Sequence, residues 1–587
     1  MRTSLLLLLL LLPSSSSSRS TSLPTPAAAS SPPYPFNNAS LPTAQRVADL
    51  LSRMTLHEKV GQMFMDRDMA WGHDAPPKGD VDEASTAIDR LGVPEFIFMG
   101  QGNVYRGASN GCIVNCCSCY DGKNMSNCCH DGAATQFPQG TGVAATWNMT
   151  LIHDMGRIAA DESRGMMHFP GKRKAADYRT GASSVINILR DGRWGRAPET
   201  YGECPVLTGD VAVRLPSVNV TLLRPDSITE YTLLQYFYNM PPSQNSRLST
   251  HCLLLTPSLH PPHLLPAHTP PDLNCGPEFA SLTNATKSGF ISEEEIDVSV
   301  ARLLRRRVQI GDLDIPASAD PYASIPYSVV DSPAHQAVAR QIVAESTVIL
   351  HNGLVASSHD GSPSGPLLKR STEEGTEEEE QAPQRVLPLA RGVGRIAVIG
   401  PSADDLRVQA HTYHGTPSKW ITVFDGLKEV AGGGTTFTFT EGCSRTKSGS
   451  GLNISGAVAA AQNADVVIFV GGLEASMEEE GTDRINSIAL PGDQMKVVEA
   501  LQGVGKPMVV ITISGGPVAE PVLATAPNLA WVWVSYFGQD GRGISDVLFG
   551  DVPASGALPF TVPLHVAQLG SIVDYSMTAP PFGKTYR

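Results

Sequence analysis

Two stretches of the sequence concentrate side chains that enzymes use for acid–base chemistry and for holding polar ligands. The first, called here the arginine segment, spans residues 190–203 and contains Arg190, Arg196 and Glu199 beside Trp194. Arginine presents forked donors to hydroxyls and carboxylates, and tryptophan offers a flat face for stacking, so recognition of a polar ligand is one interpretation. A structural network of ion pairs is the other, and residue chemistry alone leaves both open.

The second stretch, the glutamate loop, spans residues 473–484. It contains four glutamates, among them Glu478 and Glu480, and it ends with Asp483 and Arg484. Carboxylates that are crowded together raise one another's proton affinity, which suits a general acid that works near neutral pH. Considered alone, however, the loop is more simply explained as an exposed acidic surface.

The cysteines bear on metal chemistry and on the compartment. Six of the ten lie between Cys112 and Cys129. Disulfides are favoured over a zinc cluster there, because only His130 adds a nitrogen ligand and the spacing of Cys116 and Cys119 is not repeated. We therefore expect no metal there. No organic cofactor is expected either, because the Gly-rich turns after the strand ending at Ile399 lack the spacing of a dinucleotide fingerprint.

The elements that precede the arginine segment suggest repeated strand–helix units. Helical spacing begins at residue 43, and Thr55 with Glu58 forms a capping box that opens a second helix. Strand candidates at 96–99 and 185–189 alternate with helical stretches up to about residue 215, a rhythm compatible with a barrel. Residues 215–271 are rich in Pro, Ser, Leu and His, and no regular element is predicted there.

The second half of the chain predicts a doubly wound α/β sheet whose strand ends carry functional loops. Beyond residue 385, helices are expected at 456–462 and 494–501, and strands at 396–399, 466–470, 508–513 and 529–534. Before the linker, helices expected at 292–307 and 334–347 lead into a strand at 348–350 that we assign to the N-terminal domain. The glutamate loop follows the strand at 466–470. We expect an N-terminal domain at 43–350, an acidic linker at 351–385 and a C-terminal domain at 386–587.

Charge and hydropathy exclude two classes of partner. The 44 basic against 58 acidic residues give a net charge of −14, which argues against a nucleic-acid partner. The longest apolar run, residues 5–12, is far shorter than the roughly 20 residues of a membrane span. With Arg2 before it and small residues after it, this run predicts a signal peptide at 1–29. Six Asn-x-Ser/Thr sequons agree with a secreted, cell-wall location.

The arginine segment and the glutamate loop, in this order, resemble glycoside hydrolase family 3 and especially its β-xylosidase branch. Further matching stretches are Leu56-His-Glu-Lys-Val60, Ala144-Ala-Thr-Trp147-Asn148, Ser332-Pro-Ala-His335, Ala397-Val-Ile-Gly400-Pro401, Leu490-Pro-Gly492 and Ser514-Gly-Gly-Pro517. The resemblance implies an α/β fold in which an N-terminal (β/α)8-barrel-like domain, here incomplete, precedes an α/β/α sandwich.

What the resemblance implies about chemistry is a retaining glycosidase with two carboxylates, an Asp nucleophile on a barrel strand and a Glu acid/base from the second domain. Glu478, five residues before Asp483, matches the acid/base position by spacing, and Glu480 is its rival. Arg196 matches an arginine that holds sugar hydroxyls, with Arg190 and Glu199 as further substrate-binding candidates.

The chain departs from the family where the nucleophile should lie. Residues 210–271 contain only Asp210 and Asp226 as aspartates, neither in the family's setting, and Cys204 stands where an Asp is usual. The nucleophile is therefore unknown. We expect an exo-acting β-xylosidase that acts on xylo-oligosaccharides. A β-glucosidase of the same family and a catalytically inactive carbohydrate-binding relative are the alternatives.

Overall fold

The computed structural model describes much of the chain. The described residues are 34–63, 88–93, 134–166, 188–214, 272, 278–309, 311–314, 324–355, 384–411, 414 and 417–572.

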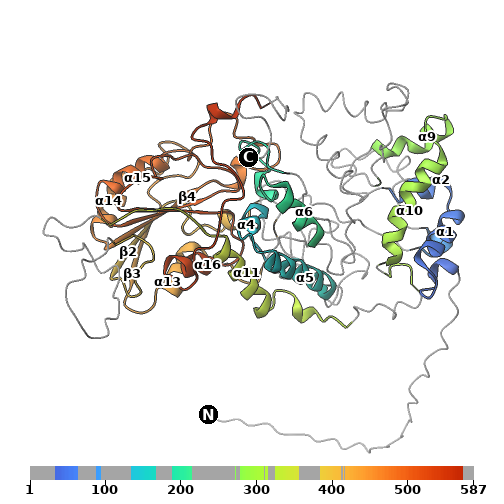
Figure 1. Cartoon of the computed structure of the whole chain (residues 1–587), viewed down its shortest axis with the longest axis horizontal. Helices are drawn as coiled ribbons and strands as arrows, with labels where there is room; N and C mark the ends of the chain where they lie inside the picture. The colour runs from blue at the N-terminus through green and yellow to red at the C-terminus, as the bar shows by residue number, and fades with distance from the viewer. Residues whose placement is uncertain are drawn as a thin grey trace, which may run out of the picture.

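A six-stranded mixed sheet forms the centre of the C-terminal half (Figure 1). Its strands are β1 (Val348–Asn352), β2 (Arg395–Ile399), β3 (Thr436–Thr440), β4 (Val466–Gly472), β5 (Met508–Ile513) and β6 (Leu529–Val534). The strand order is β1-β6-β5-β4-β2-β3, with β1 antiparallel to β6 and the other neighbours parallel. The four predicted strands that became β2, β4, β5 and β6 are thus confirmed.

Helices cover both faces of this sheet, so the C-terminal half has three layers (Figure 1). They are α13 (Val423–Val430) and α16 (Arg542–Leu548) on one face, and α14 (Ile454–Gln462) and α15 (Gln494–Gln502) on the other. Along β4, Val466, Ile468 and Val470 enter the core under α13 and α16, whereas Val467 and Phe469 enter the opposite core. Because successive side chains of a strand point to opposite faces, a strand buried on both sides is apolar throughout.

Two strands differ from the prediction. β1 pairs with β6, Val348 opposite Trp533, so a strand assigned from sequence to the N-terminal half belongs to this sheet. β3 is not among the predicted strands. It lies at the sheet edge and alternates Thr with Phe, and this half-exposed pattern lacks the continuous apolar run that identified its neighbours.

The described part of the N-terminal half consists of helices and short turns. They are α1 (Thr43–Arg53), α2 (Leu56–Gly61), α4 (Gly140–Ala145), α5 (Met149–Met166), α6 (Pro205–Arg214), α9 (Leu282–Lys287), α10 (Glu293–Gln309) and α11 (Pro333–Ser346), with the one-turn α12 (Arg407–Ala410) farther on. The capping box of Thr55 and Glu58 is present at the start of α2, as predicted.

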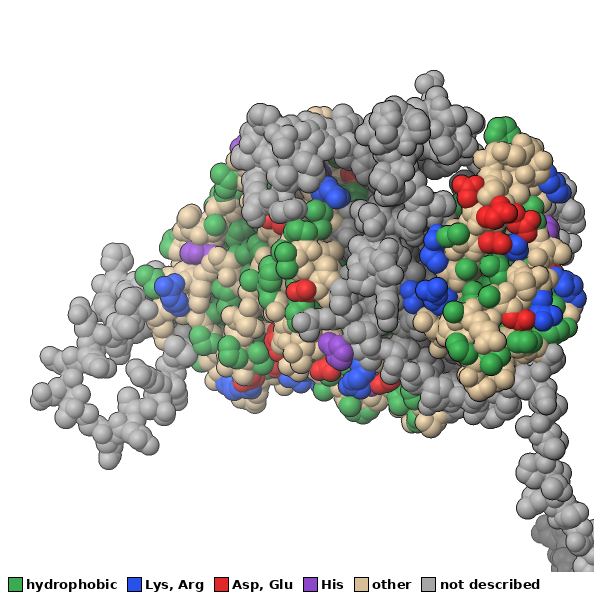
Figure 2. Space-filling model, turned by 45° about the vertical axis from the view of Figure 1, so that its right-hand side comes forward, with side chains coloured by type: hydrophobic (Ala, Val, Ile, Leu, Met, Phe, Trp, Pro, Cys, Tyr) green, Lys and Arg blue, Asp and Glu red, His purple; other side chains and the backbone are tan. Residues whose placement is uncertain are grey.

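These helices form two groups (Figure 1). One group, α1, α2, α9 and α10, shares a core that includes Leu50, Val60 and Leu304. The other, α4, α5, α6 and α11, lies beside the sheet, and α11 is joined to α16 by the ion pair of Arg340 with Asp546 at 2.6 Å. On the face seen in Figure 2, acidic and basic side chains are interspersed over the first group.

The predicted barrel is not confirmed. Among the described residues no strand precedes Val348. The strand candidate at 96–99 and the irregular stretch at 215–271 lie outside the described residues, and of the candidate at 185–189 only 188–189 are described, in non-strand conformation. No described helix is long and apolar enough to cross a membrane.

Candidate active site

The arginine segment and the glutamate loop lie against each other. The backbone N–H of Arg484 donates to the carbonyl of Arg193 at 2.8 Å, and the N–H of Gly195 donates to Oδ1 of Asp483 at 2.8 Å. These partners are almost three hundred positions apart in the sequence. The two stretches that sequence chemistry singled out therefore form one site, at the junction of the two halves.

Arg196 connects a carboxylate from each stretch. Its Nε and Nη2 donate to the two carboxylate oxygens of Glu199 at 3.0 and 2.7 Å, and its Nη1 lies 3.1 Å from Oε1 of Glu480. Arg196 and Glu199 are buried, whereas the Glu480 side chain keeps 26% of its surface exposed. Arg190, at the start of the segment, is exposed. Sugar binding by these residues stays a prediction.

Glu478 is in a different environment, because it is fully buried. Its Oε1 accepts hydrogen bonds from the N–H of Gly515 at 2.6 Å and from the hydroxyl of Tyr536 at 2.7 Å, and its Oε2 accepts from the N–H of Gly516 at 3.1 Å. Nη2 of Arg484 lies 3.6 Å from Oε2. Both carboxylate oxygens are thus occupied as acceptors.

Tyr536 keeps its proton in this arrangement. Burial, followed by the neighbouring charge of Glu478, raises the pKa of the Tyr536 phenol well above its ordinary value. The ring of His411 packs against that of Tyr536, tilted by 38° with centroids 4.2 Å apart, and its Nε2 lies 2.6 Å from the backbone carbonyl of Glu478. A carbonyl oxygen only accepts, so Nε2 carries a hydrogen. Side chain and backbone of Glu478 are therefore both held.

These groups come from loops that follow parallel strands. Glu478 follows β4, the Gly515–Gly516 turn follows β5, and Tyr536 follows β6. The carboxyl ends of parallel strands meet at one edge of the sheet, where ligands bind in open α/β folds. Spacing within the glutamate loop could not reveal the partners of Glu478, because they lie on other loops. The Ser514-Gly-Gly-Pro517 stretch was the available signal.

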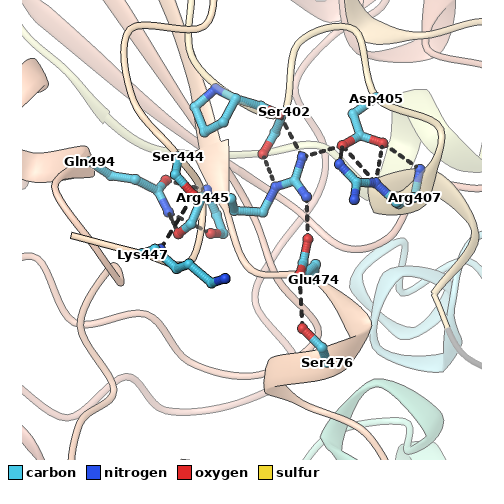
Figure 3. Close-up of polar contacts among 11 residues, drawn as sticks. Ser402, Asp405, Arg407, Ser444, Arg445, Lys447, Glu474, Ser476 and Gln494 are labelled. Carbon is cyan, nitrogen blue, oxygen red and sulfur yellow. Dashed lines mark hydrogen bonds and ion pairs between the residues drawn. The ribbon is translucent and has the colours of Figure 1, made fainter. Parts of the chain in front are cut away.

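A second, partly buried network supports the base of the glutamate loop (Figure 3). The guanidinium of Arg445 donates to Oγ of Ser402 at 3.0 Å, to Glu474 at 2.5 Å and to Asp405 at 2.6 Å. Burial alone would raise the pKa of Asp405, but hydrogen bonds from Arg407 and Arg445 outweigh it and hold the value at about 2. The loops after β2, β3 and β4 are joined by this one side chain.

The remaining candidate residues are the two aspartates considered for the nucleophile and the cysteines. Asp210 is exposed on α6, and Asp226 lies outside the described residues, as does the cysteine cluster at 112–129 with His130. In the part of the chain that the structure describes, Cys204 and Cys443 are free, and no group of three or more His, Cys, Asp or Glu side chains is arranged to hold a metal ion.

Residues 381–586 match the glycosyl hydrolase family 3 C-terminal domain. The chain is 26% identical to probable β-D-xylosidase 7 of Arabidopsis thaliana over 90% of its own length and 71% of that protein. It is also 26% identical to β-xylosidase/α-L-arabinofuranosidase 1 of Medicago sativa subsp. varia, over 94% of its own length and 74% of that protein.

Two solved structures share its fold. The exo-β-xylosidase XlnD, solved with a xylobiose aziridine probe, superposes with a TM-score of 0.66 at 20% identity, covering 94% of this chain and 73% of that one. A β-glucosidase from Erythrobacter marinus superposes with a TM-score of 0.61 at 20% identity, covering 93% and 81%. Both coverages extend across the N-terminal and the C-terminal halves, so the two-domain α/β architecture is shared.

Proposed function

Because this chain belongs to glycoside hydrolase family 3, we propose that it is an exo-acting β-xylosidase that takes the non-reducing terminal xylose of xylo-oligosaccharides. A β-linked glycan as substrate follows from the family. The choice of xylose is supported by the names of the curated relatives. The observation that carries the proposal is Arg196, held between Glu199 and Glu480 where the two halves meet.

The chemistry of this arrangement is that of a sugar subsite beside an acid. In a retaining glycosidase one carboxyl group protonates the leaving oxygen and then activates water, while a second forms the glycosyl-enzyme. In this chain Arg196 would donate to a sugar hydroxyl. An accessible carboxylate of the glutamate loop would handle the proton.

Between the two candidate acids, we favour Glu480. A proton donor must reach the leaving oxygen, and Glu480 is partly exposed and adjoins Arg196. Glu478, which sequence spacing favoured, has both oxygens occupied by donors and is closed to solvent. Its geometry suits a buried anion that fixes the loop.

Whether this chain has the proposed activity depends on the presence of a nucleophile. The stretch at 210–271 lacks the Ser-Asp strand end that carries the nucleophile in the family. Acid catalysis alone contributes about 10²- to 10⁴-fold. We therefore propose that the chain binds the sugar but hydrolyses aryl β-xylosides slowly or not at all.

The second candidate is a β-glucosidase, because the β-glucosidase fold neighbour matches nearly as well as the xylosidase. The third, an inactive carbohydrate-binding relative, is favoured by the missing nucleophile. For localisation we propose secretion to the cell wall, supported by the apolar run at residues 5–12 and by exposed sequons at Asn284 and Asn453. A reporter fused behind residues 1–33 tests this by its appearance in the medium.

The deciding experiment measures binding and turnover together. D-xylose and D-glucose are titrated calorimetrically, and 4-nitrophenyl β-xyloside, β-glucoside and α-L-arabinofuranoside are assayed for release of nitrophenol. Xylose should bind more tightly than glucose, and Arg196→Met should weaken the binding of the sugar. Glu480→Gln should remove any residual hydrolysis, because it cannot protonate the leaving oxygen. Tighter glucose binding would favour the second candidate, and binding of neither sugar would overturn the proposal.

A further inference from the structure

We propose that Gly195, Asp483 and Arg484 are positioning residues, and that the contact they form sets Arg196 against Glu480. This contact, called here the loop junction, consists of residues 192–195 of the arginine segment and residues 479–484 of the glutamate loop. The inference deepens the proposed function and rests on it for the identity of the sugar. The contact itself is independent of which sugar binds.

The hydrogen bonds of the loop junction use the backbone of the arginine segment. Arg484 donates its N–H to the carbonyl of Arg193 at 2.8 Å and its Nη2 to the carbonyl of Gly192 at 3.1 Å. In the other direction, the N–H of Gly195 donates to Asp483 at 2.8 Å. The same Nη2 of Arg484 donates to the carbonyl of Pro517 at 2.7 Å. Arg484 is buried and therefore ties the arginine segment to the loop after β5 as well.

Close packing explains why a glycine occupies position 195. A Cβ added there would lie 2.0 Å from the carbonyl oxygen of Thr482 and 2.3 Å from that of Glu479. Both obstacles are backbone atoms, which cannot rotate away as a long side chain could. Gly515, on the loop after β5, packs equally closely against the arginine segment, since a Cβ added there would lie 2.0 Å from Cγ of Pro198. Glycine at both positions permits the approach of the two halves.

The loop junction is adjacent in sequence to the groups it would position. Gly195 immediately precedes Arg196, and Asp483 lies three residues after Glu480. Because residues 195–196 and residues 480–483 are both anchored at the loop junction, Nη1 of Arg196 and Oε1 of Glu480 are held 3.1 Å apart. A separation of the loops would leave each side chain in its own half of the molecule, with the sugar site divided between them.

The test uses hydrogen–deuterium exchange on the full-length chain, read on peptides that cover residues 192–200 and 478–484. Hydrogen bonds to charged groups are each worth about a factor of ten or more in an opening equilibrium. We therefore expect Gly195→Ala to raise exchange in both peptides about tenfold, while peptides of α10 exchange as in the wild type. Gly209→Ala is the matched control, because a Cβ on that helical glycine meets nothing within 4 Å.

A second pair of variants keeps the test sharp if Gly195→Ala unfolds more widely. Asp483→Asn retains an acceptor oxygen for the N–H of Gly195, whereas Asp483→Ala does not. We expect faster exchange at the junction in the alanine variant and wild-type exchange in the asparagine variant. Equal exchange in both, or wild-type exchange of the two peptides in a folded Gly195→Ala protein, would overturn the positioning role.

Sugar titration separates this inference from the proposed function. If the wild type binds xylose, Gly195→Ala and Asp483→Ala should weaken the affinity about tenfold, and Asp483→Asn should restore it. If the wild type binds neither xylose nor glucose, the proposed function fails, and the exchange data alone still decide whether the junction exists. Unchanged affinity together with faster exchange would refute the link between the junction and the sugar site.

Discussion

Replacing Glu478 with alanine should destabilise the C-terminal half strongly, whereas Glu480→Ala should not. The first change removes the acceptor of two backbone N–H groups and of the Tyr536 hydroxyl, all buried, and an anion 3.6 Å from Arg484. Removing one partner from such a buried charged cluster costs about 3–5 kcal/mol. The ion pair of the partly exposed Glu480 with Arg196 is worth about 0–1 kcal/mol, and Arg196 keeps Glu199.

Urea titration measures this difference without any requirement for turnover. The fluorescence of Trp531 and Trp533, which are buried in β6, reports unfolding of the sheet. With a slope of about 1–3 kcal/mol per molar urea, the expected loss moves the midpoint of Glu478→Ala down by about 1 M or more. Glu478→Gln, which keeps the size of the side chain, should fall between the two alanine variants. Similar midpoints for Glu478→Ala and Glu480→Ala would refute the role of Glu478 as a buried structural anion.

Three further outcomes are expected. The pKa of Asp405 is 3.8 in its ordinary state and about 2 here. Its contribution to stability is therefore complete above pH 3.8 and is lost as the pH falls towards about 2. Acid titration of Asp405→Asn should show a flatter loss of stability between these two pH values than the wild type shows. Burial, with smaller effects of neighbouring carboxylates, raises the pKa of the Cys443 thiol to about 11; peptide mass spectrometry should find Cys443 unmodified by iodoacetamide in the native protein at neutral pH and alkylated in urea. Thr55→Ala removes one half of the capping box of α2 and should cost about 1 kcal/mol, measured as faster amide exchange in α2 than in α10.

The sheet could be predicted wherever burial on both faces forces a continuous apolar run. β4, β5 and β6 show such runs, and their positions follow from the sequence. β3 could not be found this way because an edge strand is half exposed. The membership of β1 could not be found either, since its pairing with Trp533 and its neighbours depends on residues far along the chain.

The two stretches of the candidate site could be predicted from the sequence, but the burial of their glutamates could not. The residue types of the arginine segment and the glutamate loop indicated chemistry, and their meeting is observed in the structure. Spacing to Asp483 favoured Glu478 over Glu480 as the acid. The sequence could not show that their surroundings differ, because two glutamates two residues apart look alike. Burial separates them, and the burial of Glu478 is produced by Gly515, Gly516 and Tyr536.

The separation of Gly195 from Asp483 has a consequence for the synthesis of the protein. The two residues are 288 positions apart, and a ribosome that adds about 5–20 residues per second needs roughly 14–58 s to cover that distance. During this interval the guanidinium of Arg196 can pair with Glu199 but not with Glu480, and the backbone around Gly195 has no partner from the glutamate loop. The nascent N-terminal half must therefore remain soluble with an unfinished surface, and the site closes only after the glutamate loop has been synthesised.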